Sequence, residues 1–140
     1  MRQFLAIVVL WIPLSANAAG FCERQPIDPE VPAGLAGSYE IIGKTPGSGE
    51  SYVGTLLVSY GKSAYALTRT IGRTAVNGDA WLEHCSPDRI RILVVRYYTK
   101  PAPLEAYCTL GADGNNYYRT TCRTSYGARR QGLESWFQTP

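Results

Sequence analysis

The residues of this chain that could support nucleophilic or acid–base chemistry are few. His84 is the only histidine in 140 residues, so a Ser-His-Asp or Cys-His arrangement would have to use it. It stands between Glu83 and Cys85 in an extended segment, where both neighbours point to the opposite face. The sequence also contains no GxSxG motif. These features favour a surface or packing histidine and a protein that is not an enzyme.

Carboxylates are the second possible source of chemistry. A glycosidase-type mechanism needs two of them roughly 5 to 10 Å apart. Glu40, Glu83 and Glu105 lie in strand-like segments and would meet only inside a barrel, so a carboxylate-based hydrolase stays open as an alternative. The 113–115 segment (DGN) is similar to part of a calcium loop but lacks the rest of that pattern. We predict a turn there, and we expect no metal site and no cofactor.

Arginine and tyrosine side chains recur at alternate positions of two strand-like segments. Both types are enriched where proteins meet partners, because tyrosine offers a large contact area and arginine forks onto carboxylates. The alternative is that long arginine side chains simply cover apolar surface. The residues expected to form a binding surface are Arg89, Arg91, Tyr97, Tyr117, Arg119 and Arg123.

Four cysteines, at positions 22, 85, 108 and 122, indicate two disulfides in an exported protein, with three pairings to choose from. No closely spaced pair of the CxxC type suggests a zinc site. If the strands form a meander, Cys108 faces Cys122 across one hairpin. Cys85 would then lie about 9.6 Å from Cys108, with a strand between them, whereas bridged Cα atoms need to be within about 7 Å. The predicted disulfides are therefore Cys108–Cys122 and Cys22–Cys85.

The elements that must position these residues are short strands, about one every 10 residues, joined by turns such as Gly61-Lys62. No window after the first 18 residues has helical periodicity. The pattern predicts an all-β domain, a small antiparallel up-and-down barrel or sandwich of seven to nine short strands. We prefer a closed barrel because closure removes exposed edges. The expected strands are 37–43, 51–60, 63–71, 74–77, 80–85, 89–98, 104–110, 116–123 and 133–138.

The chain begins with a basic residue, an apolar run of 11 residues and a small-x-small motif, which together predict a signal peptide at 1–18. An extended proline-rich arm is expected at 19–36, followed by a single β domain at 37–140. Without Arg2 the chain has 13 basic and 11 acidic side chains. That small surplus argues against nucleic-acid binding. We expect a periplasmic or secreted protein that does not insert into a membrane.

A spaced motif opens the β domain: G-x-Y at 37–39, P-x-x-G at 46–49 and Y-x-G at 52–54. It resembles the opening of small exported bacterial β-barrel proteins of uncharacterised role. The strand count is also similar to that of avidin- and lipocalin-type barrels, although the ligand-binding motifs of those families are not found. The resemblance implies a barrel and assigns no functional residue.

These observations favour an exported, non-enzymatic binding protein of the bacterial envelope. The first hypothesis is a protein partner, as for an inhibitor or an immunity-type protein directed against a secreted hydrolase. The alternative is a β-barrel that binds a small ligand or a glycan. The residues considered for the lining of such a pocket are Tyr52, Tyr65, Trp81 and Tyr107.

Overall fold

The computed structural model describes residues 22–27, 34–85, 87–112, 118–127 and 130–140. All regular secondary structure in these residues is β-strand. The strands are β1 (Cys22–Arg24), β2 (Gly37–Lys44), β3 (Ser51–Tyr60), β4 (Tyr65–Ile71), β5 (Thr74–Cys85), β6 (Ile90–Tyr97), β7 (Leu104–Ala112), β8 (Tyr118–Ser125) and β9 (Gly132–Gln138). The predicted signal peptide at 1–18 lies outside the described residues.

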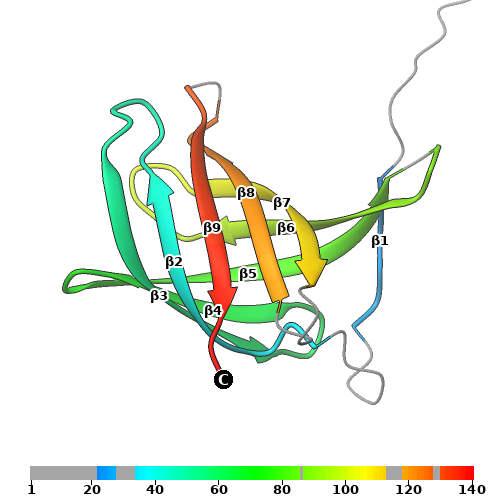
Figure 1. Ribbon diagram of the computed structural model, residues 1–140. Helices are drawn as coiled ribbons and strands as arrows, with labels where there is room; N and C mark the ends of the chain where they lie inside the picture. The colour runs from blue at the N-terminus through cyan, green and yellow to red at the C-terminus, as the bar shows by residue number, and fades with distance from the viewer. Residues whose placement is uncertain (1–21, 28–33, 86, 113–117, 128–129) are drawn as a thin grey trace, which may run out of the picture.

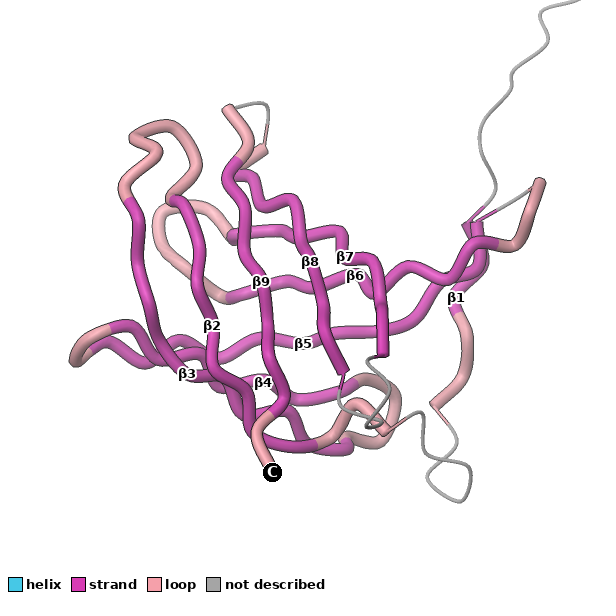
Figure 2. The backbone as a smooth tube through the Cα atoms, viewed as in Figure 1, coloured by secondary structure: helices cyan, strands magenta, loops and turns pink. Residues whose placement is uncertain are grey.

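Eight of these strands, β2 to β9, close into an antiparallel up-and-down barrel (Figures 1 and 2). Each strand pairs with the next along the chain, and β9 pairs with β2 to complete the ring. The predicted all-β fold is confirmed, and the barrel rather than the sandwich is the arrangement found. Closure leaves none of the eight with a free edge along its paired length, which is the physical advantage expected of a barrel.

Alternation along the strands places apolar side chains inside the barrel. On β4, for example, Tyr65, Leu67 and Arg69 are buried, while Ala66 and Thr68 are exposed. The half of the barrel nearest the start of β2, which we call the lower half, is filled by side chains. They include Leu35, Tyr39, Leu56, Val58, Tyr65, Leu67, Ala80, Leu93 and Trp136.

The same end is closed by the segment that leads into β2. Leu35 is buried, and its carbonyl accepts a hydrogen bond of 2.6 Å from the hydroxyl of Tyr39. The amide of Gln138 donates to the carbonyls of Gly34 and Ala36. One end of the barrel is therefore sealed by backbone and apolar contacts.

Both predicted disulfides are confirmed. Cys108 pairs with Cys122 across the β7–β8 hairpin, inside the barrel. Cys22 pairs with Cys85 and fixes β1 against β5, where the β5–β6 hairpin projects beyond the barrel (Figure 1). Two disulfides indicate an oxidising, extracytoplasmic environment. Among the described residues there is no helix long and apolar enough to cross a membrane.

Several strand ends differ from the prediction by one or two residues, and one predicted break is not found. The sequence suggests a break at Gly78-Asp79, but β5 runs without interruption from Thr74 to Cys85. A Cβ atom at Gly78 would lie 2.5 Å from the carbonyl oxygen of Arg96 and 3.0 Å from Tyr97. This glycine therefore serves a close approach between β5 and β6 and not a turn.

Candidate functional site

The end of the barrel opposite Leu35 carries the loop at 45–50, between β2 and β3, and the loops that follow β6 and β8 (Figure 1). We call this end the mouth. The 45–50 loop is closed by backbone hydrogen bonds from Thr45 to Glu50 and from Gly49 to Thr45. Gly49 has a positive φ of 71°, a conformation that suits glycine. The tight loop keeps its side chains over the barrel opening.

A buried ion pair lies directly below the mouth. The Nε of Arg69, on β4, donates a hydrogen bond of 2.7 Å to the carboxylate of Glu134 on β9. Glu134 is fully buried and Arg69 is 8% exposed. Burying two charges is costly unless both are paired and hydrogen-bonded. The surroundings of the pair must therefore supply further donors.

Three neutral donors complete the coordination of the Glu134 carboxylate. The hydroxyl of Tyr52 lies 2.8 Å from Oε2, the hydroxyl of Tyr97 lies 3.1 Å from Oε1, and the indole Nε1 of Trp136 lies 2.8 Å from Oε1. With Arg69 Nε, each carboxylate oxygen accepts two hydrogen bonds. Four donors from β3, β4, β6 and β9 thus converge on one buried side chain.

The ring of Tyr52 reaches Glu134 because strand β2 has no side chain between them. Gly43, on β2, is paired in register with both Tyr52 and Glu134. A Cβ atom at Gly43 would lie 2.3 Å from the tyrosine ring carbon that carries the hydroxyl. Glycine at this position is therefore required for the contact across the strand.

The electrostatics of the cluster keep the tyrosines neutral and the arginine charged. Burial, followed by the nearby Glu134 carboxylate, raises the pKa of Tyr52 and of Tyr97 well above the usual range. For Arg69, burial acts to lower the pKa, but the attraction of the Glu134 carboxylate outweighs it and the net pKa is raised. The guanidinium also lies over both tyrosine rings, 4.9 Å from the centre of Tyr52 and 5.1 Å from that of Tyr97.

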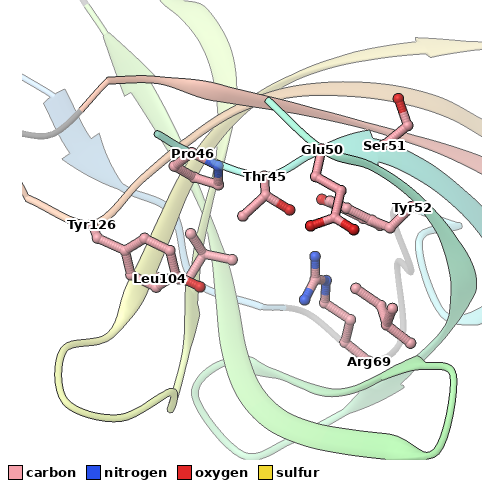
Figure 3. A pocket seen from close by; sticks show the side chains of 9 residues that line it. Thr45, Pro46, Glu50, Ser51, Tyr52, Arg69, Leu104 and Tyr126 are labelled. Atoms are coloured by element: carbon pink, nitrogen blue, oxygen red, sulfur yellow. The ribbon is translucent and has the colours of Figure 1, made fainter. Parts of the chain in front are cut away.

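A cavity of about 280 Å³ occupies the mouth above this cluster (Figure 3). In the figure the Arg69 guanidinium points into the cavity from below, and the Glu50 carboxylate points toward it from the rim. Leu104 and Tyr126 form the opposite wall. The full lining is Thr45, Pro46, Glu50, Ser51, Tyr52, Arg69, Ile71, Leu104 and Tyr126.

The residues predicted to form a binding surface lie on different elements. Arg89 and Arg91 are exposed near the tip of the β5–β6 hairpin, where Arg89 approaches Nδ1 of His84 at 3.3 Å. Arg119 and Arg123 are exposed on the outer face of β8. Tyr117 lies outside the described residues.

The assignment of Tyr97 to that surface is wrong. Its side chain is fully buried inside the barrel, with its hydroxyl on Glu134. On β6 the alternation places Leu93, Val95 and Tyr97 together in the interior. The aromatic ring packs in the core, so Tyr97 belongs to the Glu134 cluster.

The three carboxylates considered for hydrolysis do not converge. Glu40 is exposed on β2. Glu105 pairs with Arg96 at 2.8 Å in a partly exposed ion pair, and Glu83 accepts a hydrogen bond from the indole of Trp81. Alternation places all three on the outer side of their strands. The arrangement on which the hydrolase alternative depends is therefore not formed.

Of the four aromatic residues considered for a pocket, Tyr52 alone lines the mouth cavity. Tyr65 is part of the filled core and Tyr107 is exposed on β7. Trp81 is half-buried, with the guanidinium of Arg24 lying 4.9 Å from its ring centre. The interior of the lower barrel is filled by side chains. Inside the barrel, the space for a ligand is therefore restricted to the mouth.

The sequence analysis identified neither Glu134 nor Arg69 as a site residue. The available signal was one arginine on a strand face that otherwise carries Tyr65, Leu67 and Ile71. Among the described residues, Cys22, Glu83 and Cys85 form a group with metal-ligand spacing, but both cysteines are oxidised in a disulfide. Comparisons with protein families, with curated proteins and with solved structures find no match.

Proposed function

We propose that this is an exported, non-enzymatic binding protein that holds a small ligand in the mouth of its barrel. The observation that carries the proposal is the contrast between the two ends. One end is sealed by Leu35 and filled with side chains, whereas the other holds a cavity of about 280 Å³ with a fixed guanidinium at its floor. Concave sites with a few placed polar groups are the usual form of a ligand site.

Ligand-observed NMR with a panel of small organic acids, amines and neutral compounds tests this proposal. The protein used is the oxidised chain from residue 19 onward. Thr45→Trp fills the cavity from the rim, because the Thr45 side chain lines it. The matched control is Thr121→Trp, on the exposed outer face of β8. Binding that is lost in the first variant and kept in the second supports the mouth as a ligand site. The proposal is refuted if no compound of the panel shows binding that Thr45→Trp removes.

A second candidate function is the binding of a protein partner, through the outer face of β9, β2 and β3. Ile42, Val53 and Phe137 are 50%, 70% and 41% exposed, and Ile42 faces Val53 in register. They border a shallow groove of about 570 Å³. Contiguous exposed apolar surface often marks a protein contact. Arg119 lies beside Phe137 and Arg123 beside Leu133, so a partner with an acidic rim would fit.

Affinity capture of envelope and secreted proteins with variant baits tests this second candidate. Val53→Asp places a charge in the apolar face, and Arg119→Glu reverses the charge at its edge. Both should abolish retention of a stoichiometric partner that Thr45→Trp still retains. If a partner binds all three baits equally, it does not use this face.

A further inference from the structure

The guanidinium of Arg69 has a fixed orientation with its terminal nitrogens toward the mouth. Its Nε is engaged by Glu134 at 2.7 Å, and its plane lies against the rings of Tyr52 and Tyr97. In the described part of the chain, the Nε contact is its one hydrogen bond with a protein acceptor. The side chain as a whole is more than nine-tenths buried, yet its two Nη groups are not among the fully buried unpaired atoms of the described residues, so they reach the cavity floor as donors without a protein acceptor.

The Glu134 carboxylate cannot turn to satisfy those donors. Each of its oxygens already accepts two hydrogen bonds, from Arg69 and Tyr52 at Oε2 and from Tyr97 and Trp136 at Oε1. Moving it toward the Nη groups would break its hydrogen bonds with Tyr52, Tyr97 and Trp136. An acceptor for the Nη groups must therefore come from the mouth side.

We infer that the mouth cavity binds a small organic monocarboxylate, whose carboxylate group is received by the Nη nitrogens of Arg69. A guanidinium edge presents parallel N–H donors that match the two oxygens of a carboxylate. The Glu50 side chain also points its carboxylate toward the guanidinium from the rim (Figure 3), so this chain itself presents that chemical group to the same approach. The inference rests on the proposed function and names the ligand class of the same site.

The charges around the cavity limit the negative charge that a ligand can carry. Among the described residues that line the cavity, Arg69 is the one cation, and its charge is already balanced by Glu134. Glu50 adds a negative charge at the rim, so a dianion such as a phosphate monoester would be repelled. The net attraction thus comes from local charge-assisted hydrogen bonds in a partly desolvated site.

The walls indicate that the rest of the ligand is apolar. Pro46, Ile71 and Leu104 line the cavity beside the ring of Tyr126. A volume of about 280 Å³ lies just below the usual range for ligand sites, about 300–1,000 Å³, which suits a compact body such as one aromatic ring. Such a ligand would direct its carboxylate downward to Arg69 and leave its apolar part between these walls.

Calorimetric titration of the oxidised protein with benzoate, benzamide and benzylamine tests the inference at pH 7. The three probes share one ring and differ in charge. We expect benzoate to bind about 10-fold more tightly than benzamide, because a charge-assisted hydrogen bond replaces a neutral one. Glu50→Gln should strengthen benzoate binding by about two- to five-fold, since it removes a nearby like charge. Glu40→Gln, an equivalent change on the outer face, should leave the affinity unchanged.

The direction of the Glu50→Gln effect separates the ligand classes. If benzylamine or benzamide binds at least as tightly as benzoate, and Thr45→Trp abolishes that binding, the carboxylate inference is wrong while the mouth remains a ligand site. Weaker benzoate binding in Glu50→Gln would also overturn it. The proposed function itself fails if Thr45→Trp removes the binding of none of these probes and of no compound in the wider panel.

Two further measurements keep the inference falsifiable. The double variant Arg69→Gln/Glu134→Gln removes both charges of the pair together and avoids an isolated buried charge. It should lose the preference for benzoate over benzamide; a retained preference would overturn the role of Arg69. N-acetylphenylalanine and its amide, titrated in parallel, then identify the source of the carboxylate. Discrimination between these two indicates a peptide C-terminus, whereas binding of benzoate alone indicates a free small acid.

Discussion

Removal of the arginine from the buried pair is expected to destabilise the fold strongly. In Arg69→Met, Glu134 keeps three neutral donors but loses its countercharge at 2.7 Å, in a position with no exposed surface. Breaking a buried pair by removing one partner costs about 3–5 kcal/mol. Because the hydroxyls of Tyr52 and Tyr97 and the indole remain in place, we expect a loss near the lower limit, about 3 kcal/mol.

The double variant Arg69→Met/Glu134→Gln separates the unpaired charge from the lost contacts. No charge remains buried, and the new amide oxygen still accepts hydrogen bonds from the cluster. We expect this variant to be more stable than Arg69→Met by about 2 kcal/mol, because replacement of both partners avoids the desolvation cost of an isolated ion. Urea unfolding followed by tryptophan fluorescence, with the disulfides intact, measures both differences.

The partly exposed pair of Arg96 and Glu105 supplies the control. Its side chains are 49% and 32% exposed, so Arg96→Met should change the free energy of unfolding by less than about 1 kcal/mol. The reasoning is refuted if the double variant is no more stable than Arg69→Met, or if Arg96→Met is as destabilising as Arg69→Met.

Three other changes have definite expected outcomes. Tyr52 and Tyr97 have raised pKa values in the folded protein, so their stabilising contribution is complete below the unfolded pKa of 10.0 and is lost as the pH rises above it. Absorbance at 295 nm should therefore show fewer tyrosines ionising near pH 10 in the folded protein than in the urea-unfolded protein. Equal numbers would contradict the buried cluster. Replacement of Cys22 and Cys85 by serine opens a closure of 63 residues, which should cost about 4 kcal/mol in urea unfolding while the near-ultraviolet circular dichroism of the barrel persists. Gly43→Ala places a Cβ 2.3 Å from the Tyr52 ring and should destabilise by about 1–3 kcal/mol; a neutral effect would show that the ring does not cross β2.

The barrel could be predicted from the sequence because the patterns that specify its strands and turns lie within short segments of the chain. Strand alternation and turn residues are visible within windows of about ten residues, and consecutive hairpins then leave few topologies. The length of a turn is less certain: the two-residue turn predicted at Gly61-Lys62 is a four-residue loop, since Tyr60 pairs with Tyr65. The disulfide pairing followed from the same meander, since Cys108 and Cys122 lie at equal distances from one turn. The one wrong strand break, at Gly78, arose because glycine serves both turns and close approaches, and only the neighbouring strand decides between them.

The site could not be predicted in the same way because its members are far apart in the chain. Glu134 and Tyr52 are separated by 82 residues, and Glu134 and Arg69 by 65. Their meeting depends on the register of β2 with both β3 and β9. In addition, β9 has Leu133 and Phe137 on one face and Trp136 on the other, so alternation alone does not show which face is buried. Tyr97 was misplaced for a related reason: arginines near it suggested an outer face.

The polar cluster is better explained by the position of Arg69 than by stability. A well-packed apolar pair is often at least as stabilising as a buried ion pair, and the filled lower half shows that apolar side chains pack well in this barrel. What the cluster does achieve is orientation. Glu134 holds the arginine by Nε, the two tyrosine rings confine its plane, and the Nη groups are left toward the cavity. A group held so firmly loses little conformational freedom on binding an anion, which is the physical basis of pre-organised recognition.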